Sequence, residues 1–451
     1  MTSAASPLSN PVAVIILGAG HGTRMQSALP KVLHELAGLP LIGHAMACAD
    51  HLNPAHMVAV IGGQALTVGE VAKSLRAGIA IAVQAPPQGT GDAVKQALPT
   101  LETFEGTVLI LYGDTPLMKP ATLMALAREV EAGHAVSVLG FRPTTEHAYG
   151  RLITDRDGYL HAIVEARDAT PAQLEINFCN SGVMAVEARF LRRAVLALKN
   201  DNAKGEYYLT DLVAMARAED LTTTAIEADE AEVMGVDSRS DLAIAEKIWQ
   251  EQRRTAALDA GVTLHDPSTV YFSVDTKIGK DVTIGQHVVF GPGVNLDDGV
   301  TVQPFSHVAG AHLQTGASAG PFARLRPGAK LGPDVKVGNF VEIKKAQLAR
   351  GAKVSHLSYI GDATLGEDVN IGAGTITCNY DGFNKHQTII EDGAFVGSNS
   401  SLVAPVTIGK GAYVGSGSVV TKSVGADALA VARGRQREIA DWAKKFRSKM
   451  K

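Results

Sequence analysis

Glycines and cations stand together directly after an apolar run near the N-terminus of this 451-residue chain. The run Val12–Leu17 leads into Gly18-Ala19-Gly20, and Arg24 and Lys31 follow. Glycines after a strand let backbone N–H groups approach phosphate oxygens, and a triphosphate also needs cations to neutralise it. The segment is neither common phosphate motif, because Thr23 stands where GxGxxG needs its third glycine and no GK[ST] follows. A tight strand-to-helix turn explains the glycines equally well.

An aspartate after another apolar run is the candidate metal ligand. Asp114 follows Val108–Tyr112, and ligands of doubly wound sheets bind at the carboxyl ends of the strands. A carboxylate at that place suits Mg²⁺, a hard cation that prefers oxygen. The structural alternative is an exposed turn aspartate before Thr115-Pro116.

The second half of the chain places charged residues in a segment that is otherwise apolar and small. Arg326, Lys344 and His356 are the candidates there for binding an anion and moving a proton. On residue type alone, basic residues on such a segment usually form a solvated face, and an isolated histidine is usually structural.

The elements that must position the first group alternate strand and helix. Strand-like runs are Val12–Leu17, Met57–Ile61, Ile79–Val83, Val108–Tyr112 and Ala135–Phe141. Helical patterns are Ala65–Leu75, Asp92–Leu101, Thr122–Ala132, Arg189–Lys199 and Leu209–Glu219, and a connector helix follows at Ser240–Leu258. This alternation predicts a Rossmann-like α/β domain with a mostly parallel sheet and helices on both faces.

Past Gly261 a period of six replaces the helical period. Aliphatic or aromatic residues recur every sixth position, at Ile278, Ile284, Phe290, Leu296, Val302 and Val308, and in later trains up to Val414. This repeat predicts a parallel β-helix in which three hexads close each coil and the coils stack about 4.8 Å apart. The repeat alone does not determine its handedness. The trains are interrupted at Thr377–Thr388, which predicts a functional loop.

Composition excludes several other classes of function. The net charge of −4 gives no electrostatic footprint for nucleic acid. The N-terminus lacks a signal-peptide pattern and no apolar run is long enough to span a bilayer, so we expect no membrane insertion. Three scattered cysteines fit a reducing, cytoplasmic location.

Further motifs give the chain a family resemblance. After LxAGxGTRMxSxxPKxL come QxxxxGTGxA (Gln84 to Ala93), LYGDTPL (Leu111 to Leu117), YGR (Tyr149 to Arg151), NSG (Asn180 to Gly182) and GEYYLTD (Gly205 to Asp211). Together with the hexads, they resemble the bifunctional N-acetylglucosamine-1-phosphate uridyltransferase/glucosamine-1-phosphate N-acetyltransferase family over nearly the whole length. The resemblance implies a nucleotidyltransferase domain at 1–239, a linker helix at 240–261 and a left-handed β-helix acetyltransferase domain at 262–451.

The resemblance also implies two reactions. Acetyl-CoA acetylates glucosamine 1-phosphate, and UTP with Mg²⁺ then supplies the uridylyl group, which yields UDP-N-acetylglucosamine for peptidoglycan and lipopolysaccharide. Arg24 and Lys31 would stabilise triphosphate charge. The implied UDP-sugar residues are Leu17, Gly18, Ala19, Gly20, Lys31, Gln84, Gly89, Thr90, Tyr112, Gly113, Asp114, Gly150, Glu165, Asn180 and Asp237.

The metal ligands implied by the resemblance are Asp114 and Asp237. The family usually has Asn in its GVNxR segment, whereas this chain reads Gly235-Val236-Asp237-Ser238-Arg239. Asp237 still offers oxygen, with an additional negative charge.

For acetyl transfer, the resemblance implies His356 as the general base. Arg326, Lys344, Tyr359 and Asn370 would bind glucosamine 1-phosphate, and acetyl-CoA would contact Ala373, Asn379, Tyr380, Ser398, Ser416 and Arg433. The implied partners are small-molecule substrates and two further copies of the chain, in a homotrimer that shares each acetyl site between neighbours.

Two other interpretations compete with this one. A single-activity sugar nucleotidyltransferase would use its β-helix only to oligomerise, and we would then expect no His356, Lys344 and Asn379-Tyr380 constellation. A non-catalytic binding subunit would have a degraded glycine loop or lack Asp114. The sequence contains His356, Lys344 and Asn379-Tyr380, an intact glycine loop and Asp114.

Overall fold

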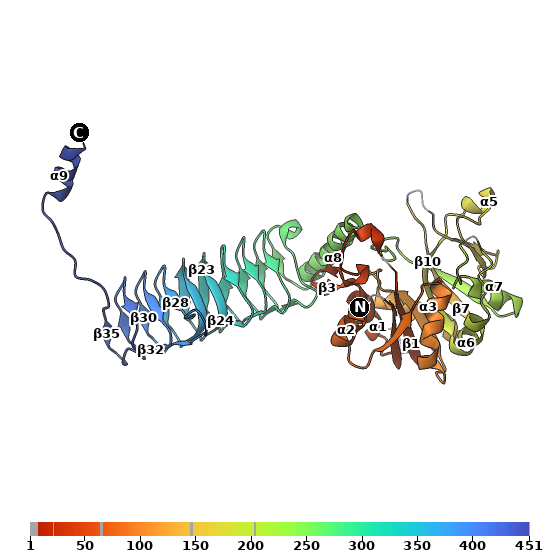
Figure 1. Ribbon diagram of the computed structural model, residues 1–451, viewed down its shortest axis with the longest axis horizontal. Helices are drawn as coiled ribbons and strands as arrows, with labels where there is room; N and C mark the ends of the chain where they lie inside the picture. The colour runs from red at the N-terminus through yellow and green to blue at the C-terminus, as the bar shows by residue number, and fades with distance from the viewer. Residues whose placement is uncertain (1–7, 21, 64–65, 145–147, 203, 451) are drawn as a thin grey trace. The chain divides into compact units, whose positions relative to one another are not determined.

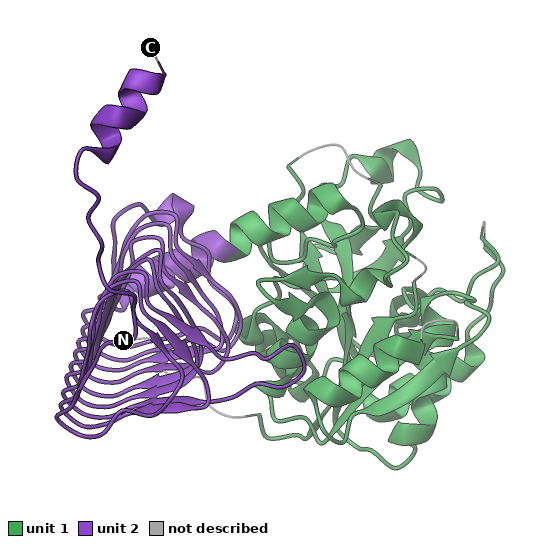
Figure 2. Ribbon diagram, turned by 60° about the vertical axis from the view of Figure 1, so that its left-hand side comes forward, with its two compact units in different colours: residues 1–249 green, residues 250–451 purple. Residues whose placement is uncertain are grey.

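The computed structural model describes residues 8–20, 22–63, 66–144, 148–202 and 204–450. The chain separates into two compact units, Met1–Trp249 and Gln250–Lys451 (Figures 1 and 2). The first unit is α/β and the second is a stack of short parallel strands, as the two sequence rhythms predict.

A nine-stranded sheet organises the first unit. Its order is β11 (Thr223–Glu227), β7 (Val136–Phe141), β10 (Cys179–Glu187), β6 (Thr107–Tyr112), β1 (Val12–Gly18), β4 (His56–Gly62) and β5 (Ala80–Gln84), with β8 (Arg151–Thr154) and β9 (Leu160–Val164) off β10. Along the main path only β10 runs antiparallel to its neighbours. The five predicted strands are therefore confirmed, and the sheet is mostly parallel.

Helices cover both faces of this sheet. Ala13, Ile15 and Leu17 of β1 belong to one core, and Val12, Val14 and Ile16 to the other. Because side chains alternate along a strand, a strand buried on both faces must be apolar throughout. The helices of the first core are α3 (Thr90–Ala97), α6 (Ala188–Ala197) and α7 (Asp211–Ala218), and those of the second are α1 (Leu41–Asp50), α2 (Leu66–Leu75) and α4 (Pro120–Glu131).

Short elements complete the first unit. They are the 3₁₀ helices η1 (Thr23–Met25), η2 (Lys31–Leu33) and η3 (Leu98–Leu101), the strands β2 (Glu35–Leu36) and β3 (Leu39–Pro40), and the helix α5 (Pro171–Leu174). The turns η1 and η2 carry Arg24 and Lys31.

The second unit is a parallel β-helix with three faces. The first face comprises β12 (Thr263–Leu264), β14 (Thr283–Ile284), β17 (Thr301–Val302), β20 (Ser318–Ala319), β23 (Lys336–Asn339), β25 (Lys353–His356), β27 (Asn370–Ile371), β30 (Phe395–Val396), β33 (Tyr413–Val414) and β35 (Leu429–Ala430). The other two faces share one sheet, because β24 (Glu342–Leu348) and β26 (Tyr359–Leu365) each continue around a corner.

The remaining strands belong to the second and third faces. Those of the second face are β15 (Val289–Phe290), β18 (His307–Val308), β21 (Arg324–Leu325), β28 (Ile376–Cys378), β31 (Ser401–Val403) and β34 (Val419–Val420). Those of the third are β13 (Lys277–Ile278), β16 (Asn295–Leu296), β19 (Ala311–Leu313), β22 (Ala329–Leu331), β29 (Thr388–Ile390) and β32 (Val406–Ile408).

The strand register confirms three hexads per coil. Ile278 pairs with Leu296, and Ile284 pairs with Val302, each three hexads further along the chain. The repeated aliphatic side chains point inward, and Ile284, Val302 and Leu325 have no exposed area. The coil that links Ile371 to Val396 is longer because it contains the interruption at Thr377–Thr388.

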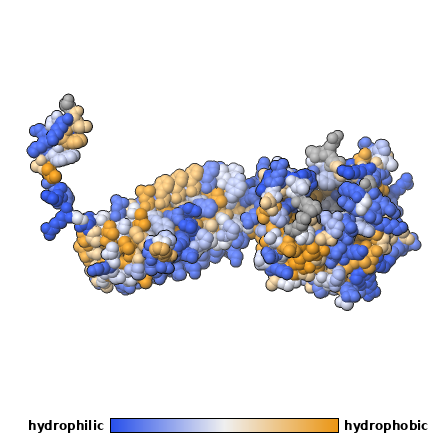
Figure 3. All heavy atoms as spheres, viewed as in Figure 1, coloured by the Kyte–Doolittle hydropathy of each residue, from blue (hydrophilic) through white to orange (hydrophobic). Residues whose placement is uncertain are grey.

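One corner of the β-helix carries an exposed aromatic ladder. The rings of Phe305, Phe322 and Phe340 stack with centroids 4.9 and 5.0 Å apart and are each about half exposed. Apolar residues accordingly reach the surface of this unit (Figure 3). All three residues have φ near +55°, a left-handed backbone conformation that is unfavourable for residues with large side chains. The ladder therefore occupies backbone positions where glycine or asparagine is usual.

Helix α8 (Arg239–Asp259) coincides with the predicted connector helix. Within the second unit, the buried Gln250 side chain accepts a hydrogen bond from the N–H of Phe272 at 2.9 Å and donates one to its carbonyl at 2.7 Å. A separate helix, α9 (Trp442–Lys449), and the one-turn η4 (Pro267–Thr269) complete the elements. None of the helices in the described ranges combines the length and hydrophobicity needed to cross a membrane.

We expect Gln250→Leu to destabilise the β-helix by about 2 kcal/mol, because both backbone groups of the buried Phe272 lose their partner. The matched control is Gln252→Leu, an exposed glutamine on the same helix. Calorimetric unfolding of both variants measures the difference. Equal unfolding profiles would show that the Gln250 contacts do not stabilise the fold.

Candidate functional sites

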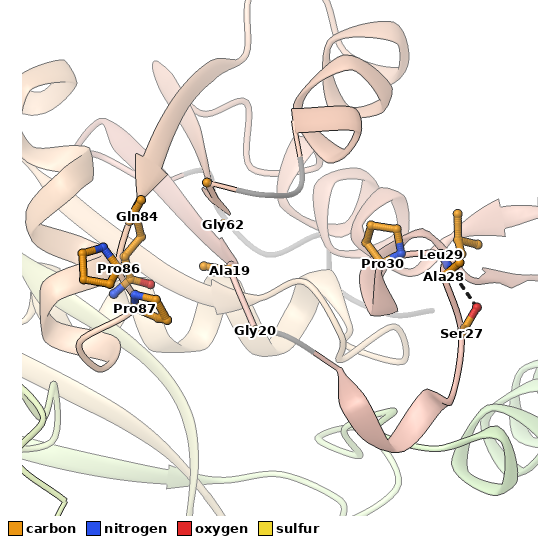
Figure 4. A pocket seen from close by; sticks show the side chains of 12 residues that line it. Ala19, Gly20, Ser27, Ala28, Leu29, Pro30, Gly62, Gln84, Pro86 and Pro87 are labelled. Atoms are coloured by element: carbon orange, nitrogen blue, oxygen red, sulfur yellow. Dashed lines mark hydrogen bonds between the residues drawn. The ribbon is translucent and has the colours of Figure 1, made fainter.

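Two adjoining cavities of about 480 and 390 Å³ open at the carboxyl ends of β1, β5 and β6. They share Ala19, Gly20, Gln84 and Pro87. In the larger cavity, Gln84, Pro86 and Pro87 face the Ser27–Pro30 segment across the Ala19-Gly20 turn (Figure 4). Seven further predicted site residues line the smaller cavity: Leu17, Gly18, Lys31, Gly89, Thr90, Tyr112 and Asp114. Gly113, also predicted, donates its N–H to the carbonyl of Leu17.

A polar turn closes one side of the smaller cavity. The Gln84 amide group donates to the carbonyl of Gly89 at 2.9 Å and to Asp92 at 2.8 Å. Gly89 has φ +105°, and a Cβ there would lie 2.7 Å from the carbonyl oxygen of Tyr207, so only glycine fits. Thr90 accepts a hydrogen bond from the N–H of Leu209. The GEYYLTD motif therefore folds directly onto the GTG turn, and its Glu206, which is not among the predicted site residues, lines the cavity.

A charge network forms the opposite side. The Lys31 ammonium lies 2.5 Å from Asp114 and 2.7 Å from Asp237, and Arg24 lies 2.7 Å from the other oxygen of Asp237. Burial lowers the pKa of Lys31, but the two carboxylates outweigh it and leave that pKa above its ordinary value. Lys31 is therefore a permanent cation, and residues from distant parts of the sequence converge on it.

The predicted sugar residues also come together. Asn180 donates its N–H to the carbonyl of Gly150 at 2.8 Å, and the Glu165 carboxyl group packs against Gly150. Burial raises the pKa of Glu165; Lys204 opposes the shift, and Asp168 and Asp211 add to it. Burial likewise raises the pKa of Tyr112, helped by Asp114 and Glu165. A neutral Tyr112 phenol thus lies near both Asp114 and Glu165.

The β-helix contains a separate cationic cavity of about 420 Å³. It is lined by Arg326, Lys344, Tyr359, Asn379, Tyr380 and Lys385. The Asp362 carboxylate accepts hydrogen bonds from Lys344 at 3.3 Å and from the Asn379 amide group. Contact with the ammonium of Lys344 lowers the pKa of Lys385. Two cations held against each other favour an anionic ligand, which relieves their repulsion.

Asp362 and Lys385 were not predicted from the sequence. Lys385 belongs to the interrupting segment, where Tyr380 and Lys385 pair as an antiparallel bridge and Asp381 accepts hydrogen bonds from the N–H groups of Phe383 and Asn384. The interruption therefore forms a compact hairpin. Its position in the repeat was the one available signal for Lys385.

His356 lies at another corner of the same coil. It is exposed, and its Nδ1 is 2.6 Å from Oδ1 of Asn339, its neighbour in the preceding coil. Since a carboxamide oxygen can only accept, Nδ1 carries a proton, and in the neutral ring the lone pair is on Nε2. The imidazole therefore presents a basic nitrogen away from Asn339.

Parallel pairing places several predicted coenzyme residues in the same column as His356. The carbonyl of His356 accepts a hydrogen bond from the N–H of Gly374. In the same way, the carbonyl of Ala373 accepts one from Asn399, and the carbonyl of Ser398 accepts one from Gly417. Arg433 donates to the carbonyl of Ser416 at 2.6 Å. Ala373, Ser398 and Ser416 thus follow His356 in successive coils, and Asn370 begins the strand that leads to Ala373.

Within one copy of the chain, the structure does not bring His356 next to the cationic cavity that contains Lys344. His356 lies at the corner between the first and second faces, whereas Lys344 lies at the corner between the second and third. Five residues, which turn the corner at Leu357 and form the second face of the coil, separate His356 from Asp362, the partner of Lys344. His356 and Asn370 do not line the cationic cavity.

Comparisons with known proteins agree with both units. Residues 14–203 match the MobA-like NTP transferase domain, and residues 387–422 match six repeats of the bacterial transferase hexapeptide. The chain is 54% identical to the bifunctional protein GlmU of Paramagnetospirillum magneticum over 98% of this chain and 97% of the relative. Identity is 50% with that of Jannaschia sp. (98% and 97%) and 46% with that of Zymomonas mobilis (98% and 98%). With this similarity over nearly its whole length, the chain belongs to the family of bifunctional GlmU proteins.

Proposed function

We propose that this chain makes UDP-N-acetylglucosamine in two steps at the two cationic sites. The β-helix site transfers acetyl from acetyl-CoA to the amino group of glucosamine 1-phosphate. The α/β site transfers uridylyl from UTP to the product. The observation that carries this proposal is that one chain of this family has both sites, each with the cations and the acid or base groups that its step requires.

In the uridylyl step, a phosphate oxygen of N-acetylglucosamine 1-phosphate attacks the α-phosphorus of UTP. The bond to the β-phosphate breaks, and pyrophosphate leaves. Arg24 and Lys31 offset the charge that moves onto pyrophosphate, and backbone N–H groups of Gly18–Gly20 approach the phosphates. Gln84, Gly89 and Thr90 hold the base, while Gly150, Glu165 and Asn180 hold the sugar.

The residues around Lys31 also fit Mg²⁺. Asp114 and Asp237 both reach one ammonium nitrogen, so their carboxylates converge on a single point. Two carboxylates, with phosphate oxygens and water, are the usual surroundings of Mg²⁺ beside a nucleotide. When bound there, the metal would neutralise the phosphate oxygens and align them for in-line attack.

In the acetyl step, the amino nitrogen of glucosamine 1-phosphate attacks the thioester carbonyl carbon. Nε2 of His356 takes a proton from that nitrogen, the carbon–sulfur bond breaks, and coenzyme A leaves as its thiol after protonation. Arg326, Lys344 and Lys385 bind the sugar phosphate. The coenzyme lies along the corner that continues from His356, where it contacts Ala373, Ser398, Ser416 and Arg433. The hairpin of another copy brings Asn379 and Tyr380 to the coenzyme.

A homotrimer would complete this site. Because His356 and Lys344 lie at different corners of a coil, a neighbouring copy is needed to bring one group against the other. The exposed rings of Phe305, Phe322 and Phe340 repeat with the spacing of the coils. A second β-helix has the same spacing, so its coils can pack against these rings one by one. These features support side-by-side trimers with shared sites, and the proposed use of UTP and acetyl-CoA supports a cytoplasmic location.

The division into 1–239, 240–261 and 262–451 remains our proposal for the functional domains. A single-activity nucleotidyltransferase with a structural β-helix is the second candidate. It leaves the cationic cavity and the His356–Asn339 contact without a role.

We expect His356→Ala to lower acetyl transfer at least 100-fold, in the range of general-base catalysis, while uridylyl transfer stays unchanged. Separate assays with glucosamine 1-phosphate and with N-acetylglucosamine 1-phosphate measure the two rates. The matched control is His307→Ala, an exposed histidine elsewhere on the β-helix. Equal loss of both activities in His356→Ala would contradict separate sites.

We expect Lys344→Ala to raise the KM for glucosamine 1-phosphate about tenfold, because a charge-assisted contact to phosphate is lost. Lys345→Ala is the control, since Lys345 is exposed and does not line the cavity. Steady-state kinetics at saturating acetyl-CoA distinguish the two variants. An unchanged KM in Lys344→Ala would exclude this cavity as the phosphate site.

We expect Asp237→Asn to raise the Mg²⁺ concentration for half-maximal uridylyl transfer, because one ligand charge is lost while an oxygen remains. Asp237→Ala should raise it further. Titration of Mg²⁺ at saturating UTP measures both. If all three proteins need the same Mg²⁺ concentration, Asp237 does not bind the metal.

A further inference from the structure

The Asp237 side chain belongs to the α/β site but stands on no helix or strand. It stands in the segment Gly235–Ser238, which leads into helix α8. Backbone in such a segment is free to vary unless other groups fix it. Since Asp237 must meet Asp114 across the site, the contacts that fix this segment bear directly on its geometry.

One contact is a carboxylate that gathers three donors. Oδ2 of Asp241 accepts hydrogen bonds from the N–H of Asp237 at 3.1 Å, the N–H of Ser238 at 2.8 Å and the Ser238 hydroxyl at 2.8 Å. Asp241 is in the first turn of α8, where a carboxylate is favoured. The backbone on either side of the Asp237 side chain is therefore tied to a helix.

A second contact joins this segment to Lys31. Arg239 donates from Nη1 to Nδ1 of His34 at 3.1 Å. His34 is buried and directly follows the η2 turn that carries Lys31. Two contacts thus connect the same two segments side by side, Lys31 with Asp237 and His34 with Arg239.

The protonation state of His34 suits this role. Arginine only donates, so Nδ1 of His34 must accept and the ring must be neutral. Burial, together with the neighbouring Arg239 guanidinium, holds the pKa of His34 below its ordinary value. The contact is therefore available at neutral pH.

We propose that Asp241 and the Arg239–His34 pair are positioning residues that aim the Asp237 carboxylate at the metal. All three contact the segments that carry Asp237 and Lys31 rather than the Asp237 carboxylate itself, so they act through Asp237. The inference rests on the proposed uridylyl transfer and on Asp237 as a ligand. Asp241, Arg239 and His34 then have a specific task, although none of them is proposed to touch the substrate.

The first experiment measures binding of Mn²⁺ alone to the full-length protein by electron paramagnetic resonance. We expect Asp241→Ala to raise the Kd about tenfold, as is usual for groups that orient a metal ligand. Asp241→Asn keeps an accepting oxygen and should restore a Kd close to the native one. Asp259→Ala, at the exposed far end of α8, is the control and should change nothing.

Two outcomes of this experiment overturn the role of Asp241. In one, Asp241→Ala lowers the unfolding temperature and leaves the Kd unchanged, which indicates a structural role only. In the other, Asp241→Asn binds as weakly as Asp241→Ala, which indicates that the charge of Asp241 acts on the metal directly.

The second experiment is a double-mutant cycle on the same Kd. His34→Phe keeps the ring volume without an acceptor, and Arg239→Met keeps the chain length without a donor. Each should raise the Kd about tenfold, and the double variant should match the single ones because the two residues act as one contact. Additive effects, or no effect on the Kd, would overturn the pair. His44→Phe, another buried histidine of this unit, should leave the Kd unchanged.

These measurements are independent of turnover. If the native protein binds Mn²⁺ and the variants weaken it as expected, but no UDP-sugar forms, the proposed function fails while the positioning role stands. If UDP-sugar forms with unchanged Mn²⁺ affinity in every variant, only the positioning role fails.

Discussion

Both candidate sites depend on parallel strand pairing. In the α/β unit, parallel neighbours end at the same edge of the sheet, so the glycine turn after β1, Gln84 at the end of β5 and Asp114 after β6 meet although they are far apart in sequence. In the β-helix, the same pairing stacks residues of successive coils, so Asn339 and His356 meet and Ala373, Ser398 and Ser416 continue the column. One rule of hydrogen bonding thus builds two sites of different kinds.

Charge decides what each arrangement can bind. In the first site, Lys31 and Arg24 face Asp114 and Asp237, so the site offers both cations for phosphate and carboxylates for a metal. In the second, the cations Arg326, Lys344 and Lys385 outnumber the carboxylates, since Glu342 pairs with Arg326 and Asp362 with Lys344. These charges support the proposal of a nucleotide with its metal at the first site and of a single phosphate ester at the second.

Much of this could be predicted from the sequence. Apolar runs fixed the position of five strands, because strands buried on both faces must be apolar throughout, and the period of six gave the three-hexad coil. The glycine turn, Asp114 and Lys344 stood out by type and spacing. Glu206, Asp241 and His34 did not, because their roles come from contacts that cross the fold. The separation of His356 from Lys344 also required the structure, since a period does not say which corner a residue occupies.

One chain is expected to carry out both steps, and in a fixed order. The most direct test follows the products by mass spectrometry after glucosamine 1-phosphate, UTP and Mg²⁺ are added to the native protein with or without acetyl-CoA. With acetyl-CoA, we expect N-acetylglucosamine 1-phosphate first and UDP-N-acetylglucosamine after it. Without acetyl-CoA, we expect almost no UDP-sugar. Formation of UDP-glucosamine without acetyl-CoA at a comparable rate, or no consumption of acetyl-CoA when it is present, would contradict the account.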